Sequence, residues 1–250
     1  MSSVESSAAA GSSSAAAGSP GRLPPKVLIA IVTDGRADMS LQCCVSILQT
    51  QVIMMTASDP TRQFVADLAF VKDLNEALDK LHRDRSLEAA FVIRHDTGVP
   101  GEFVTTAFAS GESLVISPAP LPAVDWDRVK KHVLDAGEDM AFSGNVYNVK
   151  LGGLPRADGY ARVAGIAALS ALFVRRQVVD DIATEHPGLI AEPVSAFAVD
   201  TVHEGKYVSA LDSFVRACGT KKMWADIKNQ ANTSGPLEYV GCVGSRRTLR

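Results

Sequence analysis

The sequence predicts an α/β domain, in which helices pack against a central sheet. Short apolar runs rich in β-branched residues recur along the chain, and segments with apolar residues at helical spacing separate them. Turn residues such as Gly, Pro and Asp lie between the two kinds of segment. A strand, a helix and a strand within about thirty residues form a right-handed parallel unit. We therefore expect a mostly parallel central sheet flanked by helices.

The first strand and the first helix open the folded part of the chain. Lys26–Val32 is a β-branched run typical of a strand that is buried on both faces. A turn at residues 33–36 follows, and Asp38 is the expected N-cap of the next helix. The apolar positions expected to face the core from this helix are Leu41, Cys44, Val45 and Leu48.

The alternation of strands and helices continues along the chain. Residues 52–55 predict a second buried strand. Asp73 and Glu76 have the spacing of a capping box and mark the start of a second helix. The apolar face of this helix is Leu74, Ala77, Leu78 and Leu81. Further strands are expected at residues 89–93, 113–117, 140–149 and 222–227. Further helices are expected at residues 125–136, 177–186 and 208–218.

The composition predicts one folded domain behind a disordered tail. Seventeen of residues 1–25 are Ser, Ala or Gly, so this segment buries too little apolar surface to offset the entropy of ordering it. Residues 26–250 are expected to form a single domain. The chain has 25 basic and 28 acidic residues, a net charge of -3, and lacks the basic excess that a nucleic-acid partner requires.

The sequence favours a soluble, cytoplasmic protein. Its longest uncharged apolar stretch, residues 163–174, is well short of the roughly 20 residues that a transmembrane helix needs. The four cysteines have no metal-ligand spacing, and the adjacent pair is poorly placed to form a disulfide, which favours a reducing compartment. These cysteines are Cys43, Cys44, Cys218 and Cys242.

Polar residues directly after the predicted strands are the first candidates for a site. In open α/β sheets, ligands bind at the carboxyl ends of the strands. The residues at these positions are Thr33, Arg36, Asp59, His95 and Asp96. No GxGxxG follows the first strand and no GxxxxGK[ST] occurs in the chain, which argues against a dinucleotide enzyme and a P-loop NTPase.

The order of the segments resembles a GT-A fold glycosyltransferase of the inverting, family 2-like type, and is similar to compact glycosyltransferases of large DNA viruses. Residues 33–36 (TDGR) resemble the family's opening P-T-x-x-R. Asp59 falls where the family has an Asp that meets the nucleotide base, and residues 74–77 (LNEA) resemble its R-N-x-A helix start. Residues 89–100 resemble the strand that ends in the metal-binding D-x-D and runs into G-f-P.

Later blocks extend the resemblance over residues 26–241. Residues 165–176 are similar to the family's small-residue strand that ends in an R-R pair. Residues 209–226 resemble s-E-D-x-x-F-x-x-R-x-x-G-x-k-x-w-x-D, in which the second acid is the catalytic base, and Asp212 matches that acid. Residues 232–241 resemble H-x-G followed by e-Y-x-G.

The resemblance implies an inverting sugar transfer, in glycan biosynthesis, from a UDP- or GDP-linked donor to a hydroxyl of a glycan or glycoprotein acceptor. Asp212 would act as general base. Asp96 would anchor Mn²⁺ or Mg²⁺ together with the diphosphate, and the ion would neutralise the charge that develops on the diphosphate oxygens. The residues expected to contact the donor are Thr33, Arg36, Asp59, Asn75, Arg94, His95 and Asp96.

Three departures from the family pattern leave alternatives open. Arg94 stands where the first Asp of D-x-D is expected, Leu211 replaces the Glu of E-D, and Thr233 stands at the position of the His. These changes permit a degenerate domain that binds a nucleotide sugar or a partner protein without chemistry. A sugar nucleotidyltransferase is a further alternative, although its glycine-rich phosphate loop is not seen near the N-terminus.

The candidate acids also have ordinary structural explanations. Asp212 is compatible with an acid favoured by the dipole at a helix N-terminus. Asp96 is compatible with a cap for a helix that follows Pro100, and Asp59 with a turn before Pro60. The family interpretation and the structural one therefore differ on whether Asp96 and Asp212 share a cleft.

Overall fold

The structure is a computed structural model that describes residues 24–33, 39–56, 63–124, 127, 130, 145–166, 168–186, 202–203, 206–207 and 223–233. An eight-stranded sheet dominates this part of the chain. In spatial order its strands are β2 (Val65–Val71), β1 (Lys26–Val32), β3 (Leu87–Arg94), β10 (Ala171–Arg175), β5 (Leu114–Ser117), β13 (Trp224–Asp226), β9 (Tyr160–Ile166) and β8 (Val149–Leu151).

Short strand pairs and helices complete the described fold. The pairs are β4 (Thr97–Gly98) with β14 (Asn232–Thr233), β6 (Pro120–Val124) with β7 (Asn145–Tyr147), and β11 (Val202–His203) with β12 (Lys206–Tyr207). The helices are α1 (Leu41–Thr56), α2 (Leu74–Arg83), α3 (Phe103–Ala109) and α6 (Arg176–Glu185).

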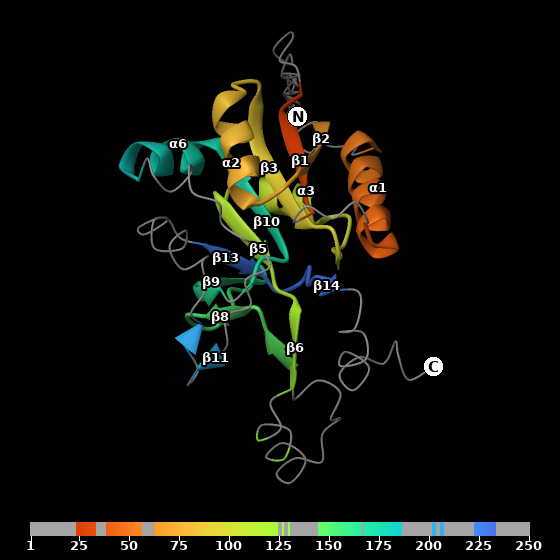
Figure 1. Ribbon diagram of the computed structural model, residues 1–250. Helices are drawn as coiled ribbons and strands as arrows, with labels where there is room; N and C mark the ends of the chain where they lie inside the picture. The colour runs from red at the N-terminus through yellow and green to blue at the C-terminus, as the bar shows by residue number, and fades with distance from the viewer. Residues whose placement is uncertain are drawn as a thin grey trace, which may run out of the picture.

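Strand β1 is buried on both faces, as its composition predicts. Val27, Ile29 and Ile31 belong to the apolar cluster that includes residues of α1 and α3. Leu28 and Val32, on the other face, belong to the cluster that includes residues of α2 and α6. The sheet therefore lies between two helical layers, with α1 on one side of the strands and α2 and α6 on the other (Figure 1).

The α/β class is confirmed, but the expectation of a mostly parallel sheet is wrong. Within the eight-stranded sheet three pairings are parallel, namely β1 with β2, β1 with β3, and β5 with β13. The other four pairings are antiparallel. Strand–helix alternation holds in the first half of the chain, whereas β8 and β9 follow each other without a crossover helix, and such neighbours pair antiparallel.

The strand expected at residues 52–55 is also wrong, because α1 continues through it to Thr56. The second strand of the parallel unit is instead β2, which pairs with β1 in register from Lys26 with Val65 to Val32 with Val71. A run of β-branched and long apolar residues fits a helix as well as a strand when tertiary contacts favour the helix.

Other expected elements agree with the structure where it describes them. Helix α2 has Asp73 as N-cap, whose side chain accepts a hydrogen bond from Glu76 N at 2.9 Å, and its predicted apolar face is buried. Strands β1, β3, β5 and β13 and helix α6 lie where patterns predicted them. The expected tail up to residue 23, helix 208–218 and most of helix 125–136 lie outside the described residues. Among the described helices, none has both the length and the apolar composition needed to cross a bilayer.

Candidate functional site

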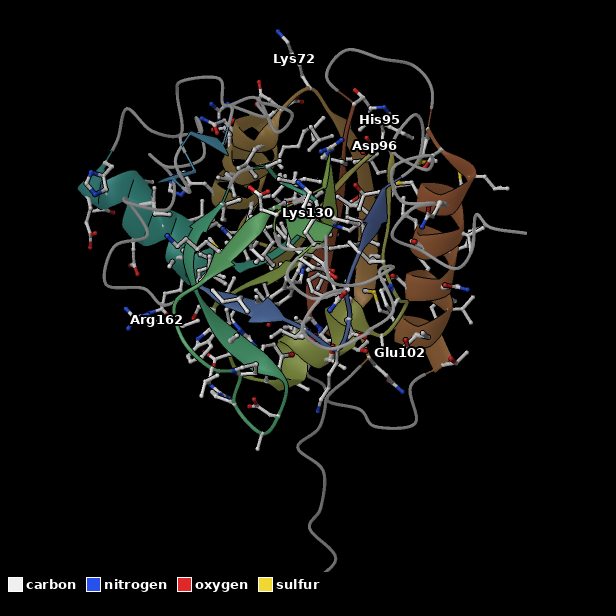
Figure 2. All side chains as sticks on the ribbon, turned by 90° about the horizontal axis from the view of Figure 1, so that it is seen from below. Lys72, His95, Asp96, Glu102, Lys130 and Arg162 are labelled. Carbon is white, nitrogen blue, oxygen red and sulfur yellow. The ribbon has the colours of Figure 1, made fainter. Side chains whose placement is uncertain are left out.

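Six strands of the eight-stranded sheet end at one edge, here called the carboxyl edge. They are β1, β2, β3, β5, β13 and β8, which run in the same direction because of their pairings with one another, with β10 and with β9. Figure 2 is seen from below relative to Figure 1 and shows His95 and Asp96 together near the end of β3. Ligands of open α/β sheets bind at such an edge.

Arg94 and Asp96 form an ion pair at the carboxyl edge. Arg94 Nε donates to Asp96 Oδ1 at 2.9 Å, and Arg94 Nη2 donates to Asp96 Oδ2. Arg94 Nη1 donates to the carbonyl of Leu169, in the segment before β10, at 3.3 Å. The Arg94 side chain is 11% exposed and that of Asp96 is 20% exposed. A bidentate pair of this kind fixes the plane of the guanidinium.

This ion pair changes what Asp96 offers to a metal ion. Both carboxylate oxygens accept hydrogen bonds from Arg94, and Oδ1 accepts a further one from Thr97 Oγ1 at 3.2 Å. A divalent ion would have to compete with a fixed positive charge for the same oxygens. Among the residues that the structure describes, no three His, Cys, Asp or Glu side chains gather as metal ligands. These residues alone therefore do not fit a resident divalent ion.

The carboxyl edge joins two segments that are far apart in the sequence. Strand β14 pairs antiparallel with β4, so that Asn232 faces Gly98 and Thr233 faces Thr97. Thr97 directly follows Asp96. The segment that resembles H-x-G and the segment that resembles D-x-D therefore lie side by side in the backbone.

A turn at the end of β13 leads the chain into β14. Asp226 is 2% exposed, and its Oδ1 accepts hydrogen bonds from Lys228 N at 3.1 Å and from Asn229 N at 3.2 Å. Its Oδ2 accepts from Asn229 Nδ2 at 2.8 Å. Ser117 Oγ, at the end of β5, donates to the carbonyl of Asn229. The Asp226 side chain therefore holds the turn that brings β14 to β4, a role that the sequence did not indicate.

A buried amide supports the segment that Arg94 contacts. Asn148 Nδ2 donates to the carbonyl of Ala168 at 2.8 Å and to Ser170 Oγ at 3.0 Å. Asn148 Oδ1 accepts from Ala119 N at 2.8 Å. The carbonyl of Ser170 in turn accepts from Arg94 N at 3.1 Å. Asn148 therefore ties together three segments behind the Arg94–Asp96 pair. The one sequence signal for Asn148 is that it is a polar residue within a predicted strand.

Thr33, Asn75 and His95 also lie near the ends of strands or at the start of a helix. Thr33 follows β1, and its N and Oγ1 donate to the carbonyl of Val71 at 3.0 and 3.4 Å. Asn75 is buried in the first turn of α2. His95 is buried, and its N donates to the carbonyl of Val32 at 3.0 Å. Their contact with a donor stays a prediction.

Two helices begin near this edge with different charges at their N-termini. Ser40 caps α1, since its Oγ accepts from Cys43 N at 3.1 Å and its N donates to the carbonyl of His95 at 2.9 Å. The first turn of α1 contains no acidic residue. The start of α2 carries the carboxylates of Asp73 and Glu76. Because helix N-termini favour anions, the start of α1 is the more compatible with a phosphate.

Cys43, in this first turn of α1, is a buried thiol next to the site. Its Sγ donates to the carbonyl of Arg94 at 3.4 Å, and burial, then Cys44, then Asp96 raise its pKa to about 12. We expect iodoacetamide at pH 8 to alkylate Cys44 and to spare Cys43 in the folded protein, because the thiolate is the reactive form. Peptide mass spectrometry checks this, with both residues modified in urea as the control. Equal labelling of the two in the folded protein would contradict it.

The remaining candidates lie outside the described residues. They are Arg36, Asp59 and Asp212, together with the N-cap proposed at Asp38. The expected juxtaposition of Asp96 with Asp212 therefore stays a prediction. What the described chain does bring together is Arg94, Asp96 and the backbone of Thr233.

Neither the scan against protein-family models nor the search of curated proteins finds a match. Among solved structures, A197 from STIV has 11% identity and a TM-score of 0.42, with 85% of this chain and 87% of that chain covered. CMP:2-keto-3-deoxy-manno-octonic acid synthetase complexed with CTP has 9% identity and a TM-score of 0.41, with 88% and 98% covered.

HddC from Yersinia pseudotuberculosis, complexed with GMP-PN, has 10% identity and a TM-score of 0.35, with 87% of this chain and 98% of that chain covered. All three TM-scores are below 0.5. The fold described above therefore rests on the strand order and pairing of this chain itself.

Proposed function

We propose that this protein is an inverting glycosyltransferase that moves a sugar from a UDP- or GDP-linked donor to an acceptor hydroxyl. The observation that supports this most is the pairing of β4 with β14, which joins the two segments that resemble D-x-D and H-x-G beside the Arg94–Asp96 pair. In the family these segments meet the diphosphate of the donor. Here they meet at the carboxyl edge of the sheet.

Arg94 is the proposed source of positive charge for the leaving diphosphate. When the bond to the sugar breaks, negative charge develops on the phosphate oxygens and must be stabilised in the site. A guanidinium held in one orientation by Asp96 does this without reorganising. The start of α1, which lacks acids in its first turn, adds a favourable dipole. Asp96 then acts as the residue that positions Arg94.

Asp212 is the proposed general base. The acceptor hydroxyl must lose its proton as it attacks the anomeric carbon from the side opposite the diphosphate. A carboxylate on that side takes the proton, the new glycosidic bond forms, and the bond to the diphosphate breaks with inversion. This role comes from the match of residues 209–226 to the family block.

A divalent ion at Asp96 stays a prediction from the resemblance. Both oxygens of Asp96 already accept hydrogen bonds from Arg94 or Thr97, so the described residues alone do not fit this ion. The alternative, a domain that binds a nucleotide sugar without chemistry, is favoured by one observation: Arg94 already neutralises the surviving acid of the D-x-D-like segment.

Thermal unfolding with a panel of UDP- and GDP-linked sugars tests donor binding. We expect one class of donor to raise the melting temperature without Mn²⁺, since a ligand at 100 times its Kd adds roughly 2.7 kcal/mol to the stability of the folded state. The Arg94→Met variant should lose this shift, because the diphosphate then lacks its cation. Arg162→Met, which removes an exposed arginine of β9, is the matched control and should keep it.

The other outcomes separate the alternatives. A shift with donor but no transfer to any acceptor favours the degenerate domain. A shift that appears only with Mn²⁺ and survives in Arg94→Met would contradict the role of Arg94 and assign the charge to a metal at Asp96. No shift with any nucleotide sugar, in wild-type protein that folds, would contradict the proposed function.

A further inference from the structure

The outer face of α1 is an apolar stripe that the described part of the chain leaves exposed. The core contacts of α1 come from a different set of residues, Cys43, Ser46, Ile47, Thr50 and Met54. The stripe points away from the sheet and is exposed, to 80% at Leu41 and 78% at Met55. The residues of this stripe, called the α1 stripe, are Leu41, Val45, Leu48, Val52 and Met55.

The spacing of the α1 stripe is that of a coiled-coil seam. Its members follow one another at intervals of four, three, four and three residues, which is the alternation of d and a positions in a heptad. Val45 and Val52 then occupy a positions, and Leu48 occupies the d position between them. β-branched residues at a with leucine at d favour a two-stranded parallel pairing. The stripe therefore has the pattern of a helix that pairs with a copy of itself.

Strand β2 extends the apolar surface beside the α1 stripe. Leu68 pairs with Ile29 of β1 and Phe70 with Ile31, so both lie on the sheet face that α1 covers. Phe70 is 60% exposed, and β2 is the last strand of the sheet on this side. The helix and the strand edge lie next to each other in Figure 1.

The combined surface is large enough for a specific interface. The exposed fractions of the α1 stripe, Leu68 and Phe70 leave on the order of 800 Å² of apolar surface open to water, about what each partner buries in a standard interface. The largest apolar patch on a typical monomer is about 300–600 Å². Exposure of this size to water is costly, and a partner that covers it removes the cost.

The charges of α1 identify which partner fits. The helix has no Asp, Glu, Lys or Arg over its sixteen residues, so two copies meet without like-charge repulsion. The positions that flank the seam include Gln42, Gln49 and Gln51, which are polar and neutral. A helix that lies on a membrane surface instead carries Lys or Arg along its polar face. Neutral flanks around an apolar seam fit self-association.

We infer that α1 pairs in parallel with α1 of a second copy of this chain, which makes the protein a two-fold symmetric dimer. Each copy offers the same surface, as an isologous interface requires. Val45 and Val52 face their own equivalents across the axis, and Leu48 lies between them. The edge of β2, with Leu68 and Phe70, flanks the pair on the same side of the sheet.

Sedimentation equilibrium of the full chain tests the dimer. The expected mass for wild type at micromolar concentration is about twice the 26.4 kDa of one chain. Leu48→Lys places a charge at the centre of the seam, and it should give a monomer whose circular dichroism and melting transition remain those of a folded protein. Gln177→Lys adds the same charge at an exposed glutamine of α6, on the other side of the sheet, and should remain a dimer. A wild-type monomer, or a dimer that survives Leu48→Lys, would overturn the inference.

Two further measurements test whether a second copy of this chain covers the α1 stripe and whether the two helices run parallel. On a background without Cys44, Cys218 and Cys242, Val52→Cys should form a disulfide with its own equivalent under mild oxidation. The Val45→Cys variant is made on the same background and mixed with Val52→Cys. If disulfides form only between the two variants, and not between two copies of either one, the helices pair antiparallel and the parallel arrangement is overturned. Binding of wild type, as a monomer, to phosphatidylcholine vesicles, with loss in Leu48→Lys, would assign the stripe to a membrane and overturn the dimer.

Discussion

Replacing Asp212 with Asn is expected to lower the rate of sugar transfer by about 10²- to 10⁴-fold, the usual contribution of a general base. Asparagine has nearly the same shape but does not accept the proton of the attacking hydroxyl. The stabilisation of the protein by the donor should be kept, because the base faces the acceptor and not the diphosphate. Transfer is measured with the donor that gives the thermal shift, and binding is measured by that shift.

A matched control removes a carboxylate with no proposed role. The side chain of Asp127 is 99% exposed, and Asp127→Asn should leave both transfer and the donor shift unchanged. If Asp212→Asn transfers sugar at the wild-type rate, Asp212 is not the base. If the variant loses the donor shift together with transfer while it remains folded, Asp212 belongs to the donor site and the base must be sought elsewhere.

Local sequence patterns predicted the strands and helices whose burial follows from their own residues. Six of the seven residues of β1, from Val27 to Val32, are apolar, and the structure buries all six. Helix α2 has a capping residue, an acid three positions later and one apolar face, and it starts and packs as these features predict. In both segments the propensity of the residues and their final burial agree, so the sequence alone is sufficient.

Helix α1 shows why a pattern can predict an element and mistake its orientation. The stripe with the strongest apolar spacing, which includes Leu41 and Leu48, was expected to face the core and lies in solvent. The buried face contains Ser46 and Thr50, which a search for apolar residues does not find. Ser46 Oγ accepts a hydrogen bond from Val99 N at 2.8 Å, so its burial is satisfied by a partner 53 residues away.

Only the part of the candidate site that is formed by residues close together in the sequence was predictable. Arg94 and Asp96 are two residues apart, and their positions after a buried strand indicated a site edge. The approach of β14 to β4 depends on pairing across 134 residues, as between Gly98 and Asn232. It also depends on the turn that Asp226 holds. No local pattern encodes that pairing, and the sequence did not predict it.

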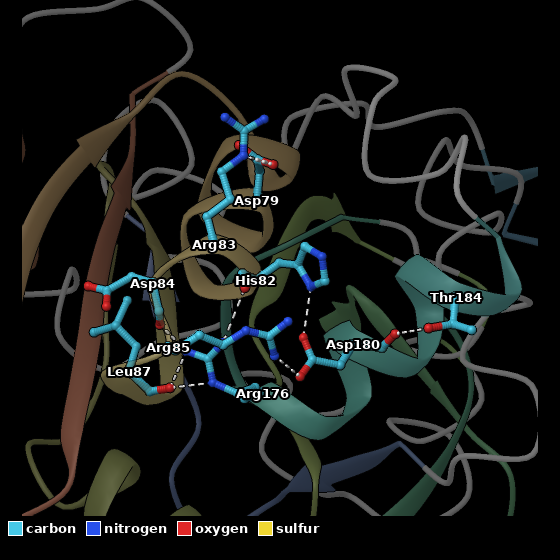
Figure 3. Close-up of polar contacts among 9 residues, drawn as sticks. All are labelled: Asp79, His82, Arg83, Asp84, Arg85, Leu87, Arg176, Asp180 and Thr184. Atoms are coloured by element: carbon cyan, nitrogen blue, oxygen red, sulfur yellow. Dashed lines mark hydrogen bonds and ion pairs between the residues drawn. The ribbon is translucent and has the colours of Figure 1, made fainter.

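Replacing Arg176 with Met is expected to destabilise the junction of α2, β3 and α6. Arg176 opens α6, and its guanidinium lies against the end of α2 and the start of β3 (Figure 3). Nε donates to the carbonyl of Leu87 at 2.6 Å and Nη1 to that of His82 at 3.3 Å, and Nη2 donates to the carbonyls of Asp84 and Leu87. Burial lowers the pKa of Arg176, which reflects removal of the guanidinium from water.

The loss of stability in Arg176→Met comes from the carbonyl groups that would be left without a hydrogen-bond donor. Hydrogen bonds to charged groups contribute about 1.5–3 kcal/mol, and a buried acceptor without a donor costs about 1–3 kcal/mol. Water reaches this half-buried position and replaces some of these bonds, so we expect a loss of about 3 kcal/mol, or roughly 6–12 °C in the melting temperature.

Arg83→Met is the matched control, because the side chain of Arg83 is 78% exposed and pairs only with Asp79 among the contacts of Figure 3. An exposed pair on a helix contributes about 0.3–0.5 kcal/mol. Arg176→Lys keeps the charge but has one donor atom in place of three, so its stability should lie between that of Met and wild type. A loss for Arg176→Met as small as that for Arg83→Met would mean that α2, β3 and α6 are held together by apolar packing, with the guanidinium replaceable by water.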